Sequence, residues 1–462
     1  MAELRADWIA TRAGGVLVQG QPGRRFRSYT IDSRQAGPGD LFFAVSAARD
    51  GHAFVADAAA RGAGGAVVSR GVEGLPSDFT VIRTDDTVRA LQALAKAVLG
   101  IRLRWVIGIT GSVGKTTTKE FTAALLADRY NVLKSEGNFN NHLGLALSLL
   151  RLEAAHSAAV LEMGMRAPGE IKALTEIAPP DVAVITNVNP AHLETLGTLE
   201  AVAAAKWEIV AGLKPGGTAV LNGDDPALRA VSKDWLGRIV RFGLGDGCEV
   251  TACGMERRGF DGLAFELQAG GRSEATRLRF LTDAYLYNAL AAAGVAHALG
   301  LPLSDIAAHI AGLRPAPKRG QWIALAQGVV LVDDSYNSNP KALETALRGL
   351  GTLPAARRVA VLGDMLELGP GEVRFHEEAG RTAAASGWDV IITVGPRARG
   401  LAEAARAAGR PAEAIAAFET SEDAAAALPA ILRPGDLVLV KGSRGVRTEI
   451  VVEAVKKLFE EN

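Results

Sequence analysis

This chain of 462 residues has only two cysteines and a formal net charge of zero. Its two cysteines, Cys248 and Cys253, are too few for a disulfide framework, and no Cys or His stands at zinc-site spacing from them. Lys plus Arg and Asp plus Glu both number 51, so no overall field favours nucleic acid or an anionic membrane. The most apolar long run, 289–303, is too short to span a bilayer, and no export signal opens the sequence. We therefore expect a cytoplasmic protein with no nucleic-acid partner and no membrane span.

The length and the apolar content predict several domains. At roughly 150 residues a domain, the chain suggests three, and its 48% of hydrophobic residues can bury sizeable cores. Apolar strand patterns alternate with helical patterns, which predicts an α/β fold. We expect a small α/β domain over 1–99, a central domain with a mainly parallel sheet over 100–314, and a doubly wound, Rossmann-like domain over 315–462. Residues 239–281 alternate like strands and suggest a small antiparallel insertion.

The most informative stretch is Gly111-Ser112-Val113-Gly114-Lys115-Thr116. A strand pattern precedes it and a helical pattern follows, which is the layout of a phosphate-binding loop. In such a loop, backbone N–H groups and the helix N-terminus face a polyphosphate. Lys115 would reach the outer phosphates and the Thr116 hydroxyl would bind magnesium. Ile109 stands where the longer signature has its first glycine, so an ordinary glycine-rich turn is the alternative.

Polar residues follow several apolar stretches near this loop. Glu162 ends a strand, at the position where nucleotide-bound magnesium finds a protein carboxylate. His192 follows the strand 181–188 and is as compatible with a structural role as with a site. Lys206 lies in a helix of small residues, where a surface lysine is the simpler interpretation. Asn140 and Asn141 belong to an amide-rich loop before another helix.

The first and last domains carry further polar segments. Asp32-Ser33-Arg34 and Asp50-Gly51-His52 can hold a phosphate or a hydroxyl, although ordinary turn chemistry is the simpler explanation of each. In the last domain, strands end in the polar segments 333–340, 363–369 and 441–444. Because parallel strands end along one edge of a doubly wound sheet, we expect these segments to gather there.

The short phosphate loop, the Asn140-Asn141 loop, Glu162, His192 and the Lys206 helix occur in the order and approximate spacing found in the Mur ligase family. Members of this family are ATP-dependent amino-acid and peptide ligases of peptidoglycan precursor synthesis. Residues 333–340 and 361–369 resemble the member that adds D-alanyl-D-alanine, and 441–444 agree. The resemblance covers all three expected domains.

The resemblance implies a monomer that uses ATP, UDP-N-acetylmuramoyl-tripeptide and D-alanyl-D-alanine, with two magnesium ions. The matching UDP-precursor residues are Ser33, Arg34, Asp50, Gly51, His52, Asn140 and Asn141. The matching ATP residues are Gly111, Gly114, Lys115, Thr116, Thr117, Asn288, Arg319, Asp334 and Asn337. The implied metal ligands are Thr116, Glu162, His192 and Lys206, and Lys115, Lys206 and His192 are the implied catalytic residues. Lys206 matches a lysine that carbon dioxide carbamylates. Since a carbamate is a hard oxygen ligand, the resemblance reverses the interpretation of Lys206 as a surface residue.

The implied reaction transfers the γ-phosphoryl group of ATP to the tripeptide carboxylate, after which the dipeptide amine attacks the acyl phosphate and phosphate leaves. Linkers near 100 and 315 would let the domains close on the substrates. Two places depart from the family: Ala284-Tyr285 stand where His-Asn is frequent, and Ser46-Ala47-Ala48-Arg49 lacks a usual glycine. The alternatives are another Mur-type or folylpolyglutamate-type ligase, or a phosphate-loop NTPase that acts as a switch.

Overall fold

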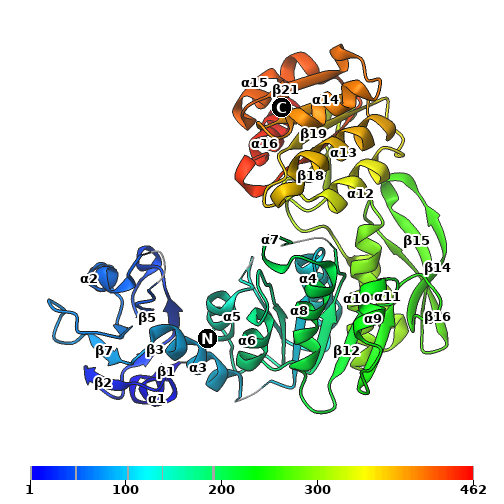
Figure 1. The fold of residues 1–462 in the computed structure, drawn as a ribbon. Coiled ribbons are helices and arrows are strands. Elements are labelled where there is room, and N and C mark those ends of the chain that lie inside the picture. Colours follow the sequence, from blue (N-terminus) through cyan, green and yellow to red (C-terminus); the bar gives the residue numbers. More distant parts are fainter. Residues whose placement is uncertain (1–2, 47–48, 101–102, 138, 190–192, 461–462) are drawn as a thin grey trace.

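The computed structural model describes residues 3–46, 49–100, 103–137, 139–189 and 193–460. Within these ranges the strands form sheets of two, five, nine and six strands. The three larger sheets follow one another along the chain, and helices pack against each of them (Figure 1). The α/β class that the sequence predicts is confirmed.

The first part of the chain forms the five-stranded sheet, in the order β2-β7-β6-β5-β4. Strands β4 to β7 run parallel, whereas β2 pairs antiparallel with β7. Helix α3 (Thr87–Leu99) ends this part of the chain, and the Asp86 side chain caps its N-terminus by accepting from the Val88 and Arg89 N–H groups. The helices and strands are β1 (Leu4–Arg5), α1 (Ala6–Arg12), β2 (Val16–Gln19), β3 (Arg25–Phe26), β4 (Ser28–Thr30), β5 (Asp40–Phe43), α2 (Val55–Ala60), β6 (Gly65–Val68), β7 (Thr80–Arg83) and α3 (Thr87–Leu99).

The central part forms the nine-stranded sheet, in the order β16-β15-β14-β13-β12-β11-β8-β10-β9. Successive residues of β8 face opposite sides, so Val106 and Ile107 lie in the cores on the two faces of the sheet. The helices and strands are β8 (Trp105–Thr110), α4 (Lys115–Leu126), β9 (Val132–Lys134), α5 (His142–Leu149), β10 (Ala158–Glu162), α6 (Glu170–Ile177), β11 (Val182–Ile185), α7 (Leu193–Leu196), α8 (Leu199–Ala211), β12 (Thr218–Asn222), α9 (Pro226–Val231), β13 (Arg238–Phe242), β14 (Val250–Arg257), β15 (Leu263–Ala269), β16 (Arg272–Leu278), α10 (Ala284–Ala298) and α11 (Leu303–Gly312).

The small antiparallel insertion expected over 239–281 is confirmed in part. Strand β13 pairs in parallel with β12, because helix α9 between them returns the chain to the same end of the sheet. Strands β14, β15 and β16 are antiparallel, as predicted, but they extend the central sheet instead of forming a sheet of their own. The alternating pattern identified the strands and left the continuity of the sheet undetermined.

The last part forms the six-stranded sheet, in the order β17-β18-β22-β19-β20-β21. All neighbouring strands are parallel except β17, which pairs antiparallel with β18. Cores cover both faces of this sheet, as expected for a doubly wound arrangement. The helices and strands are β17 (Gln321–Ala324), β18 (Val330–Asp334), α12 (Pro340–Leu350), β19 (Arg357–Gly363), α13 (Glu372–Ala385), β20 (Val390–Val394), α14 (Arg399–Ala407), β21 (Ile415–Phe418), α15 (Ser421–Ile431), β22 (Asp436–Lys441) and α16 (Glu449–Leu458).

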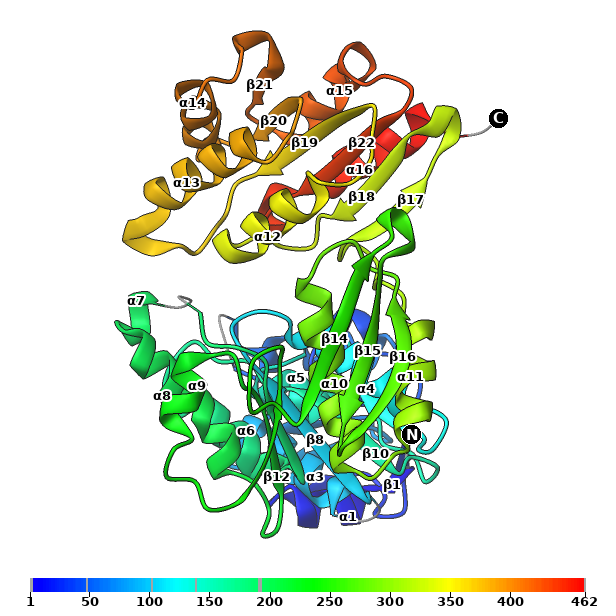
Figure 2. The same cartoon turned by 90° about the vertical axis from the view of Figure 1, so that its right-hand side faces the viewer.

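The three parts meet at two joints of different composition. At the first joint, α3 packs against α5 and α6, and one apolar core runs from the first part into the central part. At the second joint, the last part lies above the central sheet, on the side of the β14–β15 hairpin (Figure 2). The Phe260 and Trp322 rings touch there, with centroids 6.0 Å apart. Among the described residues, no helix combines the length and apolar character needed to cross a bilayer.

Candidate active site

The glycine-rich turn lies between β8 and α4, as the sequence predicts. Gly111 has φ 147° and Gly114 has φ 88°, in the region that favours glycine. A Cβ atom at Gly111 would lie 1.9 Å from Thr186 Oγ1, and one at Gly114 would lie 2.3 Å from Asn288 Oδ1. Backbone conformation and packing therefore both require glycine. The turn leads directly into the N-terminus of α4, where free N–H groups can bind an anion.

Side chains after the neighbouring strand β11 hold this loop in place. Thr186 Oγ1 donates to the Val113 carbonyl over 2.6 Å. Asn187 forms two bonds with Val113, accepting from its N–H at 2.9 Å and donating to its carbonyl at 2.9 Å. Ser112 Oγ donates to the Asn189 carbonyl at 3.0 Å. The loop is thus preorganised by residues at the end of the predicted strand 181–188, a role that the sequence did not indicate.

A buried carboxylate lies beside the loop. Glu162 ends β10 and is 2% exposed. Its Oε2 accepts from the Thr116 hydroxyl at 2.8 Å, and its Oε1 accepts from Asn140 Nδ2 at 2.8 Å. The structure therefore brings the predicted metal ligands Thr116 and Glu162 together. Asn140, predicted to bind the UDP precursor, contacts this carboxylate.

Lys115 contacts its own loop. Its Nζ donates to the Gly111 carbonyl at 2.6 Å and to the Ser112 carbonyl at 3.3 Å. Burial lowers its pKa, the negative charge of Glu162 opposes that shift, and the nearby positive charge of Arg319 adds to it. Since nearby oxygen atoms stabilise the ammonium, an anionic phosphate can replace those carbonyls as its partner.

Lys206 is not the surface lysine that its local sequence favours. It lies on α8 and is 2% exposed, because the helix turns this position towards the core. Within the described part of the chain, no residue forms a hydrogen bond or an ion pair with its Nζ. Burial, and next the positive charge of Lys115, hold the pKa of Lys206 well below its usual value. A buried amine of this kind is nucleophilic, which is the property that carbamylation requires.

The other predicted metal ligand, His192, lies outside the described residues. No group of three or more His, Cys, Asp or Glu side chains suited to a metal ion occurs in the described ranges. Magnesium does not require such a group, because it keeps water and phosphate oxygens as ligands beside one or two protein oxygens. The buried Glu162 carboxylate and the adjacent Thr116 hydroxyl fit that pattern.

A cavity of about 1030 Å³ opens at the second joint and collects most of the predicted ATP residues. Those lining it are Gly114, Lys115, Thr116, Thr117, Asn288, Arg319, Asp334 and Asn337. Asn140 and Glu162 line it as well. The central and last parts of the chain thus face one shared cavity, and Gly111 shapes the loop beneath it.

At the second linker, Arg319 reaches the phosphate loop, and polar side chains of the last part line the same cavity. The Arg319 guanidinium donates to Thr116 Oγ1 at 3.2 Å and lies over the Tyr336 ring, 3.9 Å from its centroid. Lys441 Nζ donates to Asp334 Oδ2 at 2.7 Å and to the Asn337 carbonyl at 3.0 Å. Burial raises the pKa of Asp334 against the opposing charge of Lys441. The strand ends of the last part therefore meet at the cavity, as predicted.

Asn288 and the Ala284-Tyr285 departure lie at the start of α10. Asn288 Oδ1 accepts from the Thr118 hydroxyl at 3.2 Å, next to Gly114. Ala284 and Tyr285 line the same cavity. Tyr285 donates from its phenol to the Arg319 carbonyl at 2.6 Å. The departure therefore connects the nucleotide-binding region with the linker to the last part.

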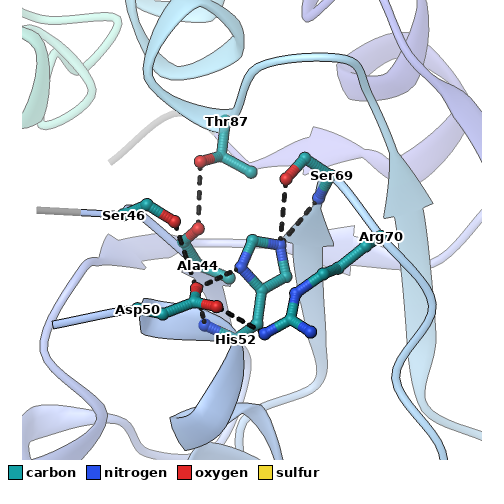
Figure 3. A network of polar contacts seen from close by, with 7 residues as sticks. All are labelled: Ala44, Ser46, Asp50, His52, Ser69, Arg70 and Thr87. Atoms are coloured by element: carbon teal, nitrogen blue, oxygen red, sulfur yellow. Dashed lines mark hydrogen bonds and ion pairs between the residues drawn. The ribbon is translucent and has the colours of Figure 1, made fainter.

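The Asp50-Gly51-His52 turn forms a polar network in the first part of the chain (Figure 3). His52 is 6% exposed, and its Nε2 accepts from the Ser69 N–H at 2.9 Å. The proton must then lie on Nδ1, which donates to Asp50 Oδ1 at 2.6 Å. Asp50 also pairs with Arg70 and accepts from Ser46, and its pKa is lowered, first by the hydrogen bond from the His52 N–H. His52 therefore ties the Asp50-Gly51-His52 turn to Ser69, directly after β6.

The remaining UDP-precursor candidates lie on separate turns. Ser33 is buried and donates to Asp57 Oδ2 at 2.8 Å, while Arg34 is exposed and paired with Asp32 at 2.8 Å. Asn141 caps α5 by accepting from the Gly144 N–H at 2.8 Å. Ser46, from the second departure, donates to Asp50, but Ala47 and Ala48 lie outside the described residues. The Arg34 side chain is 82% exposed, so its guanidinium is accessible to a ligand.

Lys119 lies one turn beyond Lys115 on α4 and was not predicted from the sequence. Its side chain is fully buried, and its Nζ donates to the Ser135 carbonyl at 2.6 Å and lies 3.2 Å from Glu120 Oε1. It anchors the start of the loop that carries Asn140. The spacing of four residues between Lys115 and Lys119 places both on one helix face, and it was the available signal.

Comparisons with known proteins agree with this geometry. A model described as "Mur ligase middle domain" matches residues 109–296, and one described as "Mur ligase, glutamate ligase domain" matches residues 318–444. The UDP-N-acetylmuramoyl-tripeptide--D-alanyl-D-alanine ligase of Bacillus subtilis (strain 168) is 35% identical over 93% of this chain and 92% of its own. The chain belongs to the Mur ligase family.

Other members of the Mur ligase family resemble the chain over similar lengths. The ligase of the same name from Escherichia coli (strain K12) is 34% identical over 93% of both chains. A crystal structure of MurF from Acinetobacter baumannii superimposes with a TM-score of 0.89, at 31% identity and 99% coverage of both chains. MurF ligase from Thermotoga maritima, solved in complex with ADP, gives a TM-score of 0.82 at 32% identity, covering 93% of this chain and 97% of its own. The three-part α/β architecture is therefore that of the family.

Proposed function

We propose that this Mur ligase joins D-alanyl-D-alanine to UDP-N-acetylmuramoyl-tripeptide with hydrolysis of ATP, in peptidoglycan precursor synthesis. The observation that carries this proposal is the cavity at the second joint, where Lys115 and Glu162 of the central part face Arg319 and Asp334. A phosphoryl donor held on one side can there meet an acceptor presented from the other. The names and full-length similarity of the relatives support this choice of substrates.

In the proposed reaction, Gly111, Gly114 and Thr117 shape the loop and helix start that bind the ATP phosphates, and Asn288 lies on the nucleotide side of the cavity. The Lys115 ammonium leaves its loop carbonyls for the outer phosphates and balances charge during transfer to the tripeptide carboxylate. Arg319 supplies a second positive charge next to Thr116. The dipeptide amine then attacks the acyl carbon, the amide C–N bond forms as the acyl C–O bond breaks, phosphate departs with that electron pair, and the nitrogen releases a proton to solvent.

Magnesium is the implied cofactor, and the residues present fit it. Thr116 and Glu162 would hold one ion at the phosphates, and Glu162, His192 and a carbamylated Lys206 would hold a second. These ions would neutralise charge on the phosphates. The Lys206 amine would add carbon dioxide and lose a proton, which gives an anionic oxygen ligand in place of a buried, uncharged amine. Its burial and depressed pKa support this assignment.

The first part of the chain would bind the UDP precursor. Arg34 has an exposed guanidinium that can contact a phosphate, whereas Ser33, Gly51 and the Asp50–His52 pair would shape the surface beside it. Asn140 and Asn141 would receive the peptide end of the precursor near Glu162. We further propose domain limits of 1–99, 100–314 and 315–462, a monomeric state and a cytoplasmic location.

Substrate-dependent phosphate release tests the function. Purified protein receives MgATP with the UDP-tripeptide and D-alanyl-D-alanine, singly and together, and mass spectrometry follows the amide product. We expect rapid release and product formation only when both substrates are present. Release that ignores both substrates would identify a phosphate-loop NTPase. Turnover with a single amino acid in place of the dipeptide would identify another ligase of the family.

A further inference from the structure

The short turn that carries Arg319 is constrained from both sides. Lys318 and Gly320 have φ values of 63° and 69°, so the chain bends sharply on either side of Arg319. From the last part of the chain, the Tyr336 N–H donates to the Lys318 carbonyl at 3.0 Å. Within the turn, the Arg319 N–H donates to the Ala316 carbonyl at 3.1 Å. The Arg319 carbonyl faces the central part, as does its guanidinium.

Tyr285 binds that carbonyl from the central part. Its phenol donates to the Arg319 oxygen at 2.6 Å. Its ring packs on Phe280 with centroids 4.6 Å apart, and Phe280 packs on Phe121 of α4 at 5.1 Å. A Cβ atom at Gly320 would lie 2.3 Å from the Tyr285 hydroxyl oxygen. The packing of its ring on Phe280 and the close backbone of Gly320 therefore fix the position of the phenol.

These contacts connect the phenol with the phosphate loop. The Arg319 side chain leaves the same turn and donates to Thr116 Oγ1 at 3.2 Å. Burial raises the pKa of Tyr285 well above its usual value, so the phenol keeps the proton that it donates. Loss of this donor would leave the carbonyl without its partner, and the backbone that positions the guanidinium could then move.

We propose that Tyr285 is a positioning residue for the ligation: its phenol fixes the Arg319 backbone, so that the guanidinium stays directed at the phosphate loop. This inference rests on the proposed function, because it assigns the effect to the phosphoryl-transfer step. It differs from a packing role, in which only the aromatic ring of Tyr285 would matter.

Kinetics of Tyr285→Phe test the positioning role, since this change keeps the ring. We expect kcat to fall about five- to tenfold, the change that corresponds to one hydrogen bond, with the KM for D-alanyl-D-alanine within about twofold of wild type. In an Arg319→Ala background, Tyr285→Phe should lower kcat by less than about twofold. The same loss in both backgrounds would overturn the proposal. Tyr130→Phe is the matched control, because Tyr130 follows the C-terminal end of α4 and its phenol oxygen accepts from Trp105 Nε1 at the start of β8.

Limited trypsin digestion tests the same contact without turnover. Trypsin cleaves after Arg319, at the carbonyl that Tyr285 binds, and yields fragments 1–319 and 320–462. We expect faster cleavage there in Tyr285→Phe, and in Gly320→Ala, whose Cβ would displace the phenol. Tyr130→Phe should match wild type. Equal cleavage in wild type, Tyr285→Phe and Gly320→Ala would refute the contact. A wild-type protein without substrate-dependent phosphate release would refute the proposed function instead, and the digestion would still decide the contact.

Discussion

The two joints of this molecule differ in what they bury. At the first joint, α3 shares an apolar core with the central part, and Leu91 and Leu94 are fully buried in it. At the second joint, the parts meet around a cavity lined by many charged and amide side chains. The apolar contacts there are the Phe260–Trp322 ring pair and Leu281, which is buried in the core of the last part. Burial of apolar surface is favourable without any ligand, whereas charged groups require partners. We therefore expect the first joint to stay rigid and the second joint to change when substrates bind.

The same difference indicates which of the two predicted linkers, near residues 100 and 315, acts as the hinge. Separation of the first joint would expose the apolar face of α3, at a cost that grows with the area exposed. Separation of the second joint would break polar contacts such as those of Arg319, which water can replace, and would expose the apolar contacts of Leu281 and Phe260 with the last part. We therefore expect closure at residues 314–320 and a fixed arrangement near residue 100.

The largest expected effect is on turnover, from a change close to the second joint. Lys206→Met should lower kcat by at least about a thousandfold, because a metal ligand contributes several kcal/mol of charge stabilisation. A small added carboxylate should restore part of the activity of Lys206→Ala, since it can occupy the place of the carbamate. Phosphate release under saturating substrates measures both effects. Full activity of either variant without rescue would disprove the carbamate assignment.

We expect the buried Lys206 to lower the stability of the folded protein relative to an apolar side chain at the same position, as is common for a residue retained for function. Its pKa is depressed in the folded protein, so the unfolded chain binds the additional proton and stability rises with pH towards the usual lysine pKa of about 10.4. In buffer free of carbon dioxide, Lys206→Met should unfold at a higher temperature than wild type at pH 7, and with a weaker pH dependence. A lower melting temperature would mean that the folded protein stabilises the ammonium.

The opposite pattern is expected at the first joint. Leu94→Ala should lower the free energy of unfolding by about 2–5 kcal/mol, because it leaves a cavity in the shared core, and should leave kcat of the folded protein unchanged. Calorimetry and activity at low temperature measure the two quantities. Lys96→Ala, exposed on the same helix, is the control, and we expect it to be close to neutral. A large loss of kcat in folded Leu94→Ala would contradict the division between the joints.

Prediction from the sequence succeeded where one segment contains the whole signal. The phosphate loop, the strand end at Glu162 and the strand ends of the last part were found because glycines, apolar runs and polar ends are local patterns. The burial of Lys206 and Lys119 was missed, since it depends on which helix face the rest of the fold covers. The Tyr285–Arg319 contact joins residues 34 positions apart, and no local pattern contains it.

A moderate effect is expected at the linker of the second joint. Arg319→Lys keeps the positive charge near Thr116 but loses the planar group that stacks on Tyr336. We expect kcat to fall about tenfold, which corresponds to a cation–π contact of moderate strength. Steady-state kinetics measure this change, and Arg314→Lys serves as the control, because among the described residues its guanidinium binds only nearby backbone carbonyls. Equal activity of Arg319→Lys and wild type would show that charge alone suffices.

The smallest expected effect is a change in the distance between spin labels placed on either side of each joint. One label pair tests each joint of the same protein. Spin labels at the exposed positions Ser77 and Glu176 span the first joint, and labels at Glu176 and Glu413 span the second. Cys248→Ala and Cys253→Ser first remove the native thiols. A nonhydrolysable ATP analogue with both other substrates should shorten the mean distance across the second joint and leave that across the first unchanged.

The outcome separates three arrangements. Shortening across the second joint alone would agree with a permanent apolar joint and a substrate-dependent polar one. Equal changes across both would mean that the core shared by α3 and the central helices yields during closure, despite its buried apolar surface. Unchanged distances, together with an unchanged radius of gyration in X-ray solution scattering, would mean that the cavity binds its substrates without closure. Water would then have to be excluded from the acyl phosphate by the substrates themselves.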